Sequence, residues 1–467
     1  MRGGAVAVSQ LCRDLSSTLQ SSVQTDESKH ATTGFEYASG FAPRTTNRFM
    51  NVIVVGGGLA GLVAARHLAA GGLDVELIER HDTAGGRVRS RIVDGYTLDR
   101  GFQVLFTAYP GVRRELDLAS LDLRSFTPGA TLARPGSTRP LADPRRDPRS
   151  LPATAAAPDA TLGDKLRVVR LWRALADRRE SEAFAGPDRS VADYLDERGF
   201  SERFVESFFA PFYGGITLDR DLSTSAAVFE YTFRMLAAGD IAVPVNGMGA
   251  VTAQLADGAR AAGAQLTLGT TVESVEPTDD DATVELGTET READAVVVAT
   301  DPPTARDLTG VESIPTDARG CVTQYLSYPS DQRLPTGGKL LLNAAGDEPN
   351  HVAPLSNVAP EYAPSGRDLL SATFLGTRDE SDDALANRVR RALASWYPDR
   401  RFDLSPVATD RIEFAQFAQP PGFYRGLPAA DAPEGPVFLA GDYTNWSSIH
   451  GAIGSGRTAA RTVLDSA

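Results

Sequence analysis

Short apolar runs alternate with longer periodic stretches over residues 50–305 of this 467-residue chain. The apolar run at 51–55 leads into a glycine-rich turn, a helical stretch and a second apolar run at 75–78. Further on, residues 251–262 have helical periodicity, and residues 293–300 form a continuous apolar run typical of a strand buried on both faces. Strands that alternate with helices in this way predict an α/β fold with a parallel sheet.

The turn after the first apolar run has the spacing G-x-G-x-x-G and is followed by an acidic residue at the end of the next run. In a βαβ dinucleotide site the first glycine allows the tight turn, the second lets the backbone approach a pyrophosphate, and the third allows close helix packing. The helix N-terminus offers free N–H groups to the phosphates, and the acid accepts hydrogen bonds from ribose hydroxyls. The residues expected to bind the dinucleotide are Gly56, Gly58, Leu59, Ala60, Gly61, Glu79 and Arg80.

The segment that follows contains Gly85-Gly86-Arg87 and then Gly101-Phe102-Gln103. It resembles the D-x-x-G-G-R segment of FAD-dependent oxidoreductases in the amine oxidase and carotene desaturase superfamily. The glycines would let the backbone pass close to the flavin, and Arg87 would bind phosphate as a planar fork. The resemblance implies FAD as cofactor, with Gly86, Arg87, Gly101 and Phe102 among its contacts.

Two later segments extend the resemblance. Val272 ends the stretch 266–272 and corresponds to the position at which family members read the adenine with backbone groups. Near the C-terminus, a strand ends at Gly441, Asp442 is free to bind a ribityl hydroxyl, and the helix that follows would face the flavin with Ile449 and Ala452. The resemblance therefore implies a two-domain α/β fold, in which a glutathione-reductase-like Rossmann domain that binds FAD is interleaved with an α+β substrate domain.

The resemblance and the patterning divide the chain. Residues 50–110, 243–305 and 431–467 are assigned to the FAD-binding domain, and residues 111–242 and 306–430 to the substrate-binding domain. Residues 1–49 are rich in Ser, Thr, Gln and charge and have little periodicity, so we interpret them as a disordered extension or as a mis-assigned start.

Composition narrows the class of function. The net charge of −14 gives no electrostatic support for nucleic-acid binding. Two cysteines and five scattered histidines indicate neither a disulfide framework nor a metal site, and no apolar run is long enough to span a membrane. These features predict a cytoplasmic protein. Only three of the 47 basic residues are lysines, and an acidic, arginine-rich chain suits the salt-rich cytoplasm of a halophile, although a GC-rich genome would skew composition the same way.

Within the superfamily, Ala108-Tyr109-Pro110 and the segment from Ala440 to Thr444 look like those of phytoene and ζ-carotene desaturases. The implied substrate is an apolar isoprenoid delivered from a membrane. The rival is a flavin-containing amine oxidase, in which a lysine lies near the flavin and an aromatic residue cages the amine. Here the strand at 320–328 has Thr323 or Gln324 at the lysine position, Ser448 falls at the cage position, and no cysteine lies near the flavin signature, so we expect non-covalent FAD.

A desaturase needs a flavin to accept a hydride from an allylic C–H bond, and the protein positions the chain and excludes water. The catalytic residues therefore stay unknown, although Phe102, Gln103, Tyr443 and His450 are candidate walls around the flavin ring. A quinone is one candidate electron acceptor. A carotenoid isomerase that uses reduced FAD and a flavin-binding scaffold without turnover are further alternatives.

Two segments of the expected substrate domain carry open alternatives. On the helix predicted at 162–179, Val168, Leu171, Trp172 and Leu175 form an apolar stripe among basic residues, which suits either a core-facing helix or a peripheral membrane contact. An aromatic segment either lines an apolar substrate tunnel or fills a core. Its members are Phe204, Phe208, Phe209, Phe212 and Tyr213.

Overall fold

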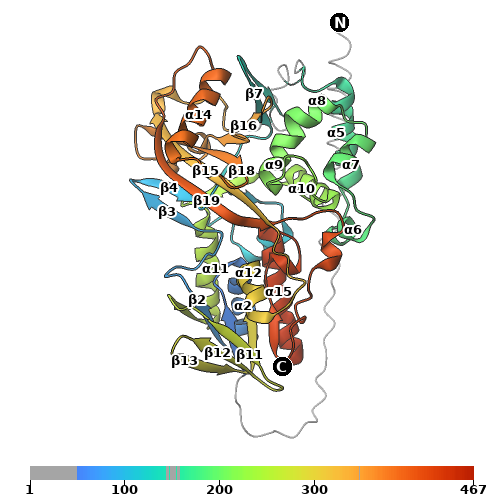
Figure 1. Ribbon diagram of the computed structural model, residues 1–467, viewed down its shortest axis with the longest axis vertical. Coiled ribbons are helices and arrows are strands. Elements are labelled where there is room, and N and C mark those ends of the chain that lie inside the picture. The colour runs from blue at the N-terminus through green and yellow to red at the C-terminus, as the bar shows by residue number, and fades with distance from the viewer. Residues whose placement is uncertain (1–49, 143–146, 148–153, 155–157, 347) are drawn as a thin grey trace.

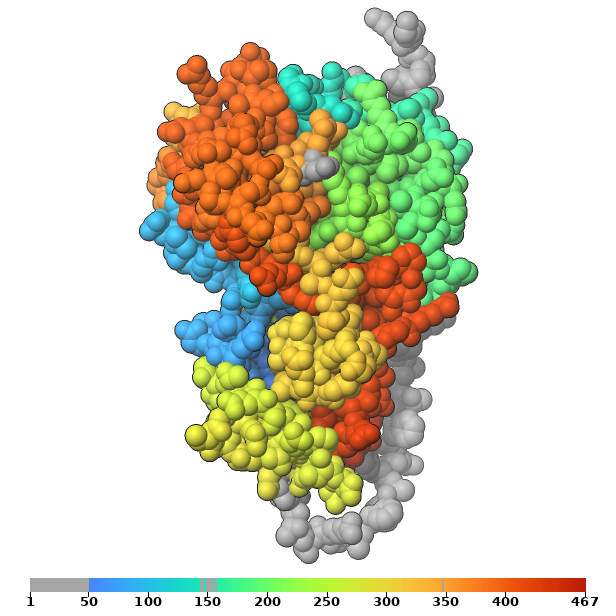
Figure 2. All heavy atoms as spheres, in the orientation of Figure 1, coloured from blue at the N-terminus to red at the C-terminus, as the bar shows by residue number. Residues whose placement is uncertain are grey.

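The computed structural model describes residues 50–142, 147, 154, 158–346 and 348–467, so the interpretation of residues 1–49 lies outside the described residues. Figure 1 shows two lobes stacked along the long axis. One contains α2, α11, α12, α15 and the strands β2 and β11 to β13, and the other contains α5 to α10, α14 and the large mixed sheet. The space-filling view in Figure 2 shows a narrower waist between the lobes.

A five-stranded parallel sheet organises the first lobe. Its strands, in spatial order, are β10 (Gln265–Leu268), β2 (Asp74–Glu79), β1 (Asn51–Val55), β14 (Ala295–Val298) and β20 (Val437–Leu439). In the central strand Val52 is paired with Val75 on one side and with Ala295 on the other. The predicted α/β fold class with a parallel sheet is confirmed.

The two faces of this sheet are covered by different layers, because alternate residues of a strand point to opposite faces. Val52 and Val54 pack in the core that contains helices α2 (Leu59–Ala70), α11 (Gly249–Ala262) and α15 (Ile449–Ser466). Ile53 and Val55 pack in a second core with a three-stranded meander and α12 (Pro302–Thr309). The meander consists of β11 (Ser274–Pro277), β12 (Ala282–Leu286) and β13 (Glu289–Ala293).

A seven-stranded mixed sheet organises the second lobe. Its strands, in spatial order, are β19 (Ser405–Phe417), β15 (Ala318–Pro329), β18 (Arg367–Leu375), β17 (His351–Ala353), β16 (Leu340–Asn343), β7 (Ala130–Arg134) and β8 (Ser137–Leu141). Neighbouring strands are antiparallel except for β16 and β7, which are parallel. One face carries Val322, Leu370 and Phe374, which pack against helix α14 (Asp382–Trp396).

Short helices complete this lobe. They are α5 (Leu162–Leu175), α6 (Glu180–Ala185), α7 (Val191–Glu197), α8 (Glu202–Phe204), the π-helical turn η2 (Val205–Phe209), α9 (Ala210–Thr217) and α10 (Ala226–Ala238). Phe204, Phe209 and Tyr213 of the aromatic segment are buried in the core between these helices. Phe208 and Phe212 are half-buried and also pack against the apolar cluster of the mixed sheet that contains Leu132 and Leu342. The segment therefore fills a core, and the substrate tunnel stays a prediction.

Small elements connect the lobes. They are the hairpin β3 (Ser90–Val93) and β4 (Tyr96–Asp99), the three-stranded sheet β5 (Leu105–Phe106), β9 (Ile241–Pro244) and β6 (Leu123–Ser125), and the helices α3 (Pro110–Glu115) and α13 (Leu355–Val358). The strands of the two large sheets fall in the segments predicted for the two domains, whereas the small sheet combines both. The assignment of these segments to cofactor and substrate stays a prediction. Within the described residues no helix has the length and apolar character needed to cross a bilayer.

A buried carboxylate ties helix α3 to two helices of the first lobe. Glu115 of α3 accepts hydrogen bonds from His67 of α2 (3.0 Å) and from Arg457 of α15. Burial alone would raise the pKa of Glu115, but these two partners outweigh it and lower the pKa to about 2. The carboxylate therefore stays ionised at neutral pH and holds α3 against the two helices that begin at the glycine turn and at the C-terminal signature.

Candidate functional site

The glycine turn between β1 and α2 is built by close backbone approaches. Gly56 has a φ of +108°, and a Cβ there would lie 2.8 Å from the carbonyl oxygen of Ala299 at the end of β14. A Cβ at Gly61 would lie 2.0 Å from the carbonyl oxygen of Gly56, so the helix packs directly on the turn. Larger side chains at either position have no room.

The second glycine of the motif has different surroundings. A Cβ at Gly58 would meet no atom within 4 Å, although the residue is half-buried and caps α2. Leu59 and Ala60 are buried in the first turn of the helix. A Cβ at Gly86 would lie 3.4 Å from the Cα of Gly58, so the two glycine backbones are direct neighbours. Two glycine backbones therefore border a space in front of a helix N-terminus, which is where a pyrophosphate binds in a dinucleotide site.

Glu79 lies at the end of β2 and is buried. One carboxylate oxygen accepts a hydrogen bond from the Gly57 amide (2.7 Å), and the other accepts one from the His81 amide (3.0 Å). This geometry brings the predicted ribose-binding carboxylate to the glycine turn. Arg80 pairs with Asp301 at 3.5 Å, and Val272 is half-buried in the loop between β10 and β11.

Four arginines gather around the Gly85-Gly86 segment. Burial and the neighbouring Arg89, Arg80 and Arg87 lower the pKa of Arg100, while the nearby Asp410 opposes this effect. Burial is the largest cause of the lowered pKa, and the three neighbouring guanidinium groups add to it, so positive charge collects at this place. A bound anion such as a pyrophosphate would relieve the repulsion, so the electrostatics suit a phosphate-containing cofactor.

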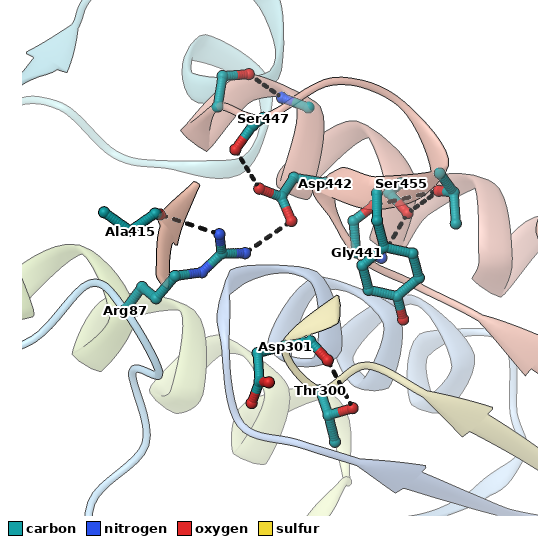
Figure 3. A network of polar contacts seen from close by, with 12 residues as sticks. Arg87, Thr300, Asp301, Ala415, Gly441, Asp442, Ser447 and Ser455 are labelled. Carbon is teal, nitrogen blue, oxygen red and sulfur yellow. Dashed lines mark hydrogen bonds and ion pairs between the residues drawn. The ribbon is translucent and has the colours of Figure 1, made fainter. Parts of the chain in front are cut away.

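Arg87 and Asp442 meet across 355 positions of sequence. An Arg87 Nη donates to one oxygen of the Asp442 carboxylate (2.7 Å), and the other guanidinium nitrogen donates to the Ala415 carbonyl (3.2 Å). Ser447 donates to the second carboxylate oxygen of Asp442 (2.7 Å). Figure 3 shows this chain of contacts beside Thr300 and Asp301, and Gly441 binds Ser455 through its amide. The C-terminal signature is therefore fastened to the G-G-R segment. Asp442 is not free, as the sequence had suggested, because both of its carboxylate oxygens accept hydrogen bonds from protein side chains.

Gly101 and Phe102 form the junction with the mixed sheet. The Gly101 amide donates to Asp410 of β19 (3.1 Å), and the Phe102 amide donates to the Thr323 hydroxyl of β15 (3.4 Å). Gln103 donates to the carbonyls of Arg87 and Arg100, while its side-chain oxygen is buried and has no hydrogen-bond partner within the described residues. That unpaired acceptor marks a place where a bound group would complete the hydrogen bonding.

The N-terminus of α15 begins at Ile449, which is half-buried, and Ala452 lies in its first turn. Ser448 caps this helix by accepting a hydrogen bond from the Gly451 amide (2.8 Å). The candidate wall residues Tyr443 and His450 are held by other contacts. The Tyr443 hydroxyl donates to the Val298 carbonyl (2.9 Å) inside a core.

His450 points toward α3 and α6. Its Nδ1 lies 3.2 Å from the Gly111 amide and its Nε2 lies 2.9 Å from Glu180, and its ring stacks on Tyr109 at 5.1 Å between centroids. It lines a cavity of about 610 Å³ between α2, α3 and α15, together with His67 and Arg457. Tyr443 and His450 therefore have structural partners that account for their positions, which the sequence pattern did not reveal.

These features define a class of protein. Glycine backbones in front of a helix N-terminus, crowded arginines and a carboxylate at the end of the second strand fit a bound dinucleotide. They define an α/β protein of the dinucleotide-binding class, in which the parallel-sheet lobe is joined to a mixed-sheet lobe.

Comparison with known proteins gives the family. The family described as flavin containing amine oxidoreductase matches residues 59–464, and the chain belongs to it. It is an FAD-dependent oxidoreductase, as the sequence predicted. A solved structure of cyclohexylamine oxidase from Brevibacterium oxydans shares the fold, with a TM-score of 0.65 and 19% identity over 90% of this chain and 99% of that one.

Curated relatives match over shorter stretches. An uncharacterised protein of Mycobacterium tuberculosis is 30% identical over 268 residues, which are 50% of this chain and 49% of that protein. The carotenoid phi-ring synthase of Streptomyces griseus is 35% identical over 179 residues (34% and 35%), and the putrescine oxidase of Kocuria rosea is 51% identical over 53 residues (11% of each). The match spans about half the length, or less, of these curated relatives.

Three residues of the site escaped the sequence reasoning. Ser447 donates to Asp442, Asp410 accepts from the Gly101 amide, and Asp301 pairs with Arg80. Asp301 carried a usable signal, because it comes shortly after the buried strand β14, and the carboxyl ends of parallel strands meet at one edge of the sheet. The other two had none, since their positions depend on how the two lobes meet.

Asp99 supplies a pH-dependent prediction. Its buried carboxylate accepts hydrogen bonds from Ser90 (2.5 Å) and from the Met248 amide (2.8 Å). Burial raises the pKa of Asp99 to about 6, although these hydrogen bonds oppose the rise. The folded state therefore keeps a proton that the unfolded state loses between about pH 4 and pH 6, so this group's contribution to stability falls as pH rises through that window.

We expect Asp99→Asn to remove this dependence. The stability of the Asn variant relative to wild type should increase between about pH 4 and pH 6, by up to ~3 kcal/mol, and should stay constant above it. Denaturant unfolding at a series of pH values measures this difference. A constant difference across the window would show that Asp99 is ionised in the folded protein throughout.

Proposed function

We propose that this enzyme oxidises a C–H bond of an apolar polyene or isoprenoid and so introduces a double bond. The observation that carries the proposal is the set of side chains that the mixed sheet presents at the Gly101–Phe102 junction. There β15 presents Thr323, and neither described lysine lies there, because Lys165 is on α5 and Lys339 pairs with Asp147. The lysine that many amine oxidases of the superfamily carry near the flavin has no counterpart on this face.

The cap of α15 adds support. Ser448 stands where an amine oxidase would present a caging ring, and its hydroxyl is used to hold the Gly451 amide. The 179-residue match to a carotenoid-pathway enzyme is also longer than the 53-residue match to an amine oxidase.

The bound flavin would accept a hydride from the substrate. The residues of this chain would bind the cofactor at Gly58, Glu79 and Arg87, and would border the reacting bond with Phe102. We propose that FAD is held without a covalent link. Cys321, the cysteine within the described residues, is buried, and burial and then Asp410 raise the pKa of its thiol to about 11, so it stays protonated. A quinone is our proposed electron acceptor.

The test is anaerobic bleaching of the flavin absorbance. One sample receives phytoene in liposomes, and a second receives a panel of mono- and diamines. We expect bleaching with the polyene alone. Bleaching with amines alone would establish the second candidate, a flavin-containing amine oxidase, which the shared fold with cyclohexylamine oxidase favours.

Helix α5 suggests how an apolar substrate reaches the enzyme. The predicted stripe faces inward, because Leu171 and Leu175 are buried in the helical core. A second apolar stripe faces outward. Leu162, Leu166 and Val169 are 67%, 44% and 36% exposed and recur at the spacing of one helix face. Exposed Arg170 and Arg173 lie on the same helix. We propose that this outward stripe rests on an anionic membrane surface.

We expect the double variant Leu162→Ser, Leu166→Ser to bind anionic liposomes about tenfold more weakly, because it removes two apolar anchors from the bilayer interface. Liposome co-sedimentation measures the bound fraction. The matched control is Ile92→Ser, which removes an equally exposed side chain (69%) from the distant strand β3. Equal binding by all three proteins would exclude α5 as the contact.

A further inference from the structure

One row of side chains crosses the mixed sheet toward the Gly101–Phe102 junction. The strand register places Asp410 opposite Thr323, Thr323 opposite Thr373, and Thr373 opposite His351. Residues directly opposite one another in a sheet share a face, so all four lie on the same face. It is the face away from α14, since the neighbouring residue Val322 packs against that helix.

This face meets the predicted flavin contacts. Thr323 and Asp410 accept hydrogen bonds from the amides of Phe102 and Gly101, and the Phe102 ring lies 5.2 Å from the His351 ring between centroids. Thr373 lies between Thr323 and His351, so it is held in the row that borders the junction.

Two polar groups of the row are buried without partners. Thr373 and His351 are 3% and 2% exposed, and within the described residues neither the Thr373 hydroxyl nor the His351 Nε2 has a hydrogen-bond partner. Unpaired buried polar groups are rare and costly, and they are retained mostly where a function requires them. The two residues stand directly opposite each other on neighbouring strands.

The protonation of His351 is fixed by its neighbours. Arg220 donates to the Asn350 side-chain oxygen (2.9 Å), which leaves the Asn350 amide nitrogen to donate to His351 Nδ1 (3.0 Å). Burial, and then the charge of Arg220, lower the pKa of His351 to about 4, so the ring is neutral at pH 7. Nδ1 accepts a hydrogen bond, and therefore Nε2 carries the proton and is a free donor.

Beyond His351 the same row becomes apolar. His351 is opposite Leu342, and Leu342 is beside Leu132 of β7. Phe208 and Phe212 pack against the apolar cluster that contains these two leucines. The face therefore combines a polar pair next to Phe102 with an apolar continuation.

We propose that Thr373 and His351 bind an oxygen atom of the substrate, a hydroxyl or a carbonyl oxygen on an otherwise apolar isoprenoid. An oxygen accepts from His351 Nε2–H and exchanges a hydrogen bond with the Thr373 hydroxyl. An ammonium group has no lone pair to accept from Nε2–H, so the pair also disfavours an amine. The isoprenoid skeleton of this substrate rests on the proposed function, and the oxygen atom on the substrate is the new element. A hydrocarbon would leave both polar groups without a hydrogen-bond partner. The free energy lost in this way makes the site favour an oxygen-bearing substrate over a hydrocarbon.

The experiment uses the flavin-loaded enzyme and a matched pair of ligands, a hydrocarbon polyene and the same polyene with one terminal hydroxyl. Binding is measured from the perturbation of the flavin spectrum under anaerobic conditions. We expect the hydroxylated polyene to bind at least tenfold more tightly to the wild type. Thr373→Val and His351→Leu should each abolish this preference without lowering the affinity for the hydrocarbon polyene. Thr373→Ser, which keeps the hydroxyl, should retain the preference for the hydroxylated polyene.

Thermal unfolding supplies a second readout. Because the Thr373 hydroxyl has no internal partner, Thr373→Val should leave Tm unchanged or raise it. The control on the opposite face is Thr409→Val, which loses a hydrogen bond to Gln324 (2.9 Å) and should lower Tm while keeping the ligand preference. Equal binding of the two polyenes, or a large fall in Tm for Thr373→Val, would overturn the oxygen site. Flavin bleaching by amines alone would instead overturn the proposed function.

Discussion

Gly456→Ala is expected to destabilise the protein by roughly 3 kcal/mol or more. A Cβ at Gly456 of α15 would lie 2.2 Å from the carbonyl oxygen of Ala60 in the first turn of α2. Backbone atoms cannot retreat as a side chain can, so the two helices must separate. Because Ala60 follows the glycine turn directly, we also expect the variant to lose flavin. Denaturant unfolding and the flavin content of purified protein measure the two effects.

The matched control is Gly454→Ala on the same helix. A Cβ there would approach only the Asn445 side-chain nitrogen, at 3.3 Å, and that group can move. Alanine is favoured over glycine within a helix by about 0.5–1 kcal/mol, so this variant should be as stable as wild type or more stable. If both variants behaved alike, the close crossing of α2 and α15 would be wrong.

Gly58→Ala is expected to fold normally and to bind FAD ten- to a hundredfold more weakly, which corresponds to about 1–3 kcal/mol of overpacking. The added methyl group meets no protein atom within 4 Å, and the backbone of Gly58 is extended (φ −77°, ψ −177°), so alanine fits the free protein without strain. The methyl group would instead occupy the space in front of α2 in which we place the pyrophosphate.

Equilibrium titration of the apoprotein with FAD measures the affinity, and thermal unfolding of the apoprotein checks the fold. Gly426→Ala is the control, since a Cβ there also meets nothing within 4 Å and Gly426 is an exposed residue far along the chain from the glycine turn. Unchanged FAD affinity in Gly58→Ala would place the pyrophosphate elsewhere.

Much of the first lobe could be predicted because its elements are encoded locally. Buried parallel strands are continuous apolar runs, and the glycine spacing between β1 and α2 reports a backbone constraint that few other sequences satisfy. Only the first part of the stretch 266–272 belongs to a strand. β10 ends at Leu268, and Gly269 with a φ of +71° begins the turn that follows. Helix α5 likewise ends at Leu175, four residues before the predicted end.

The mixed sheet and the junction could not be predicted, because their order depends on contacts between distant segments. Nothing local indicates that β7 lies beside β16, or that Asp410 of β19 receives the Gly101 amide. The polar row from Thr323 to His351 exists only through this strand register. The sequence therefore located the glycine turn and the strands around it, whereas the polar row of the mixed sheet required the structure.

The measurement that tests the central claim most directly is a single anaerobic turnover with phytoene, followed by mass spectrometry of the polyene and quantification of reduced flavin. We predict one product molecule, lighter by two hydrogen atoms, for each flavin reduced. A polyene of unchanged mass with oxidised flavin would contradict the proposed desaturation. A polyene of unchanged mass but altered geometry, formed only with reduced flavin, would identify an isomerase instead.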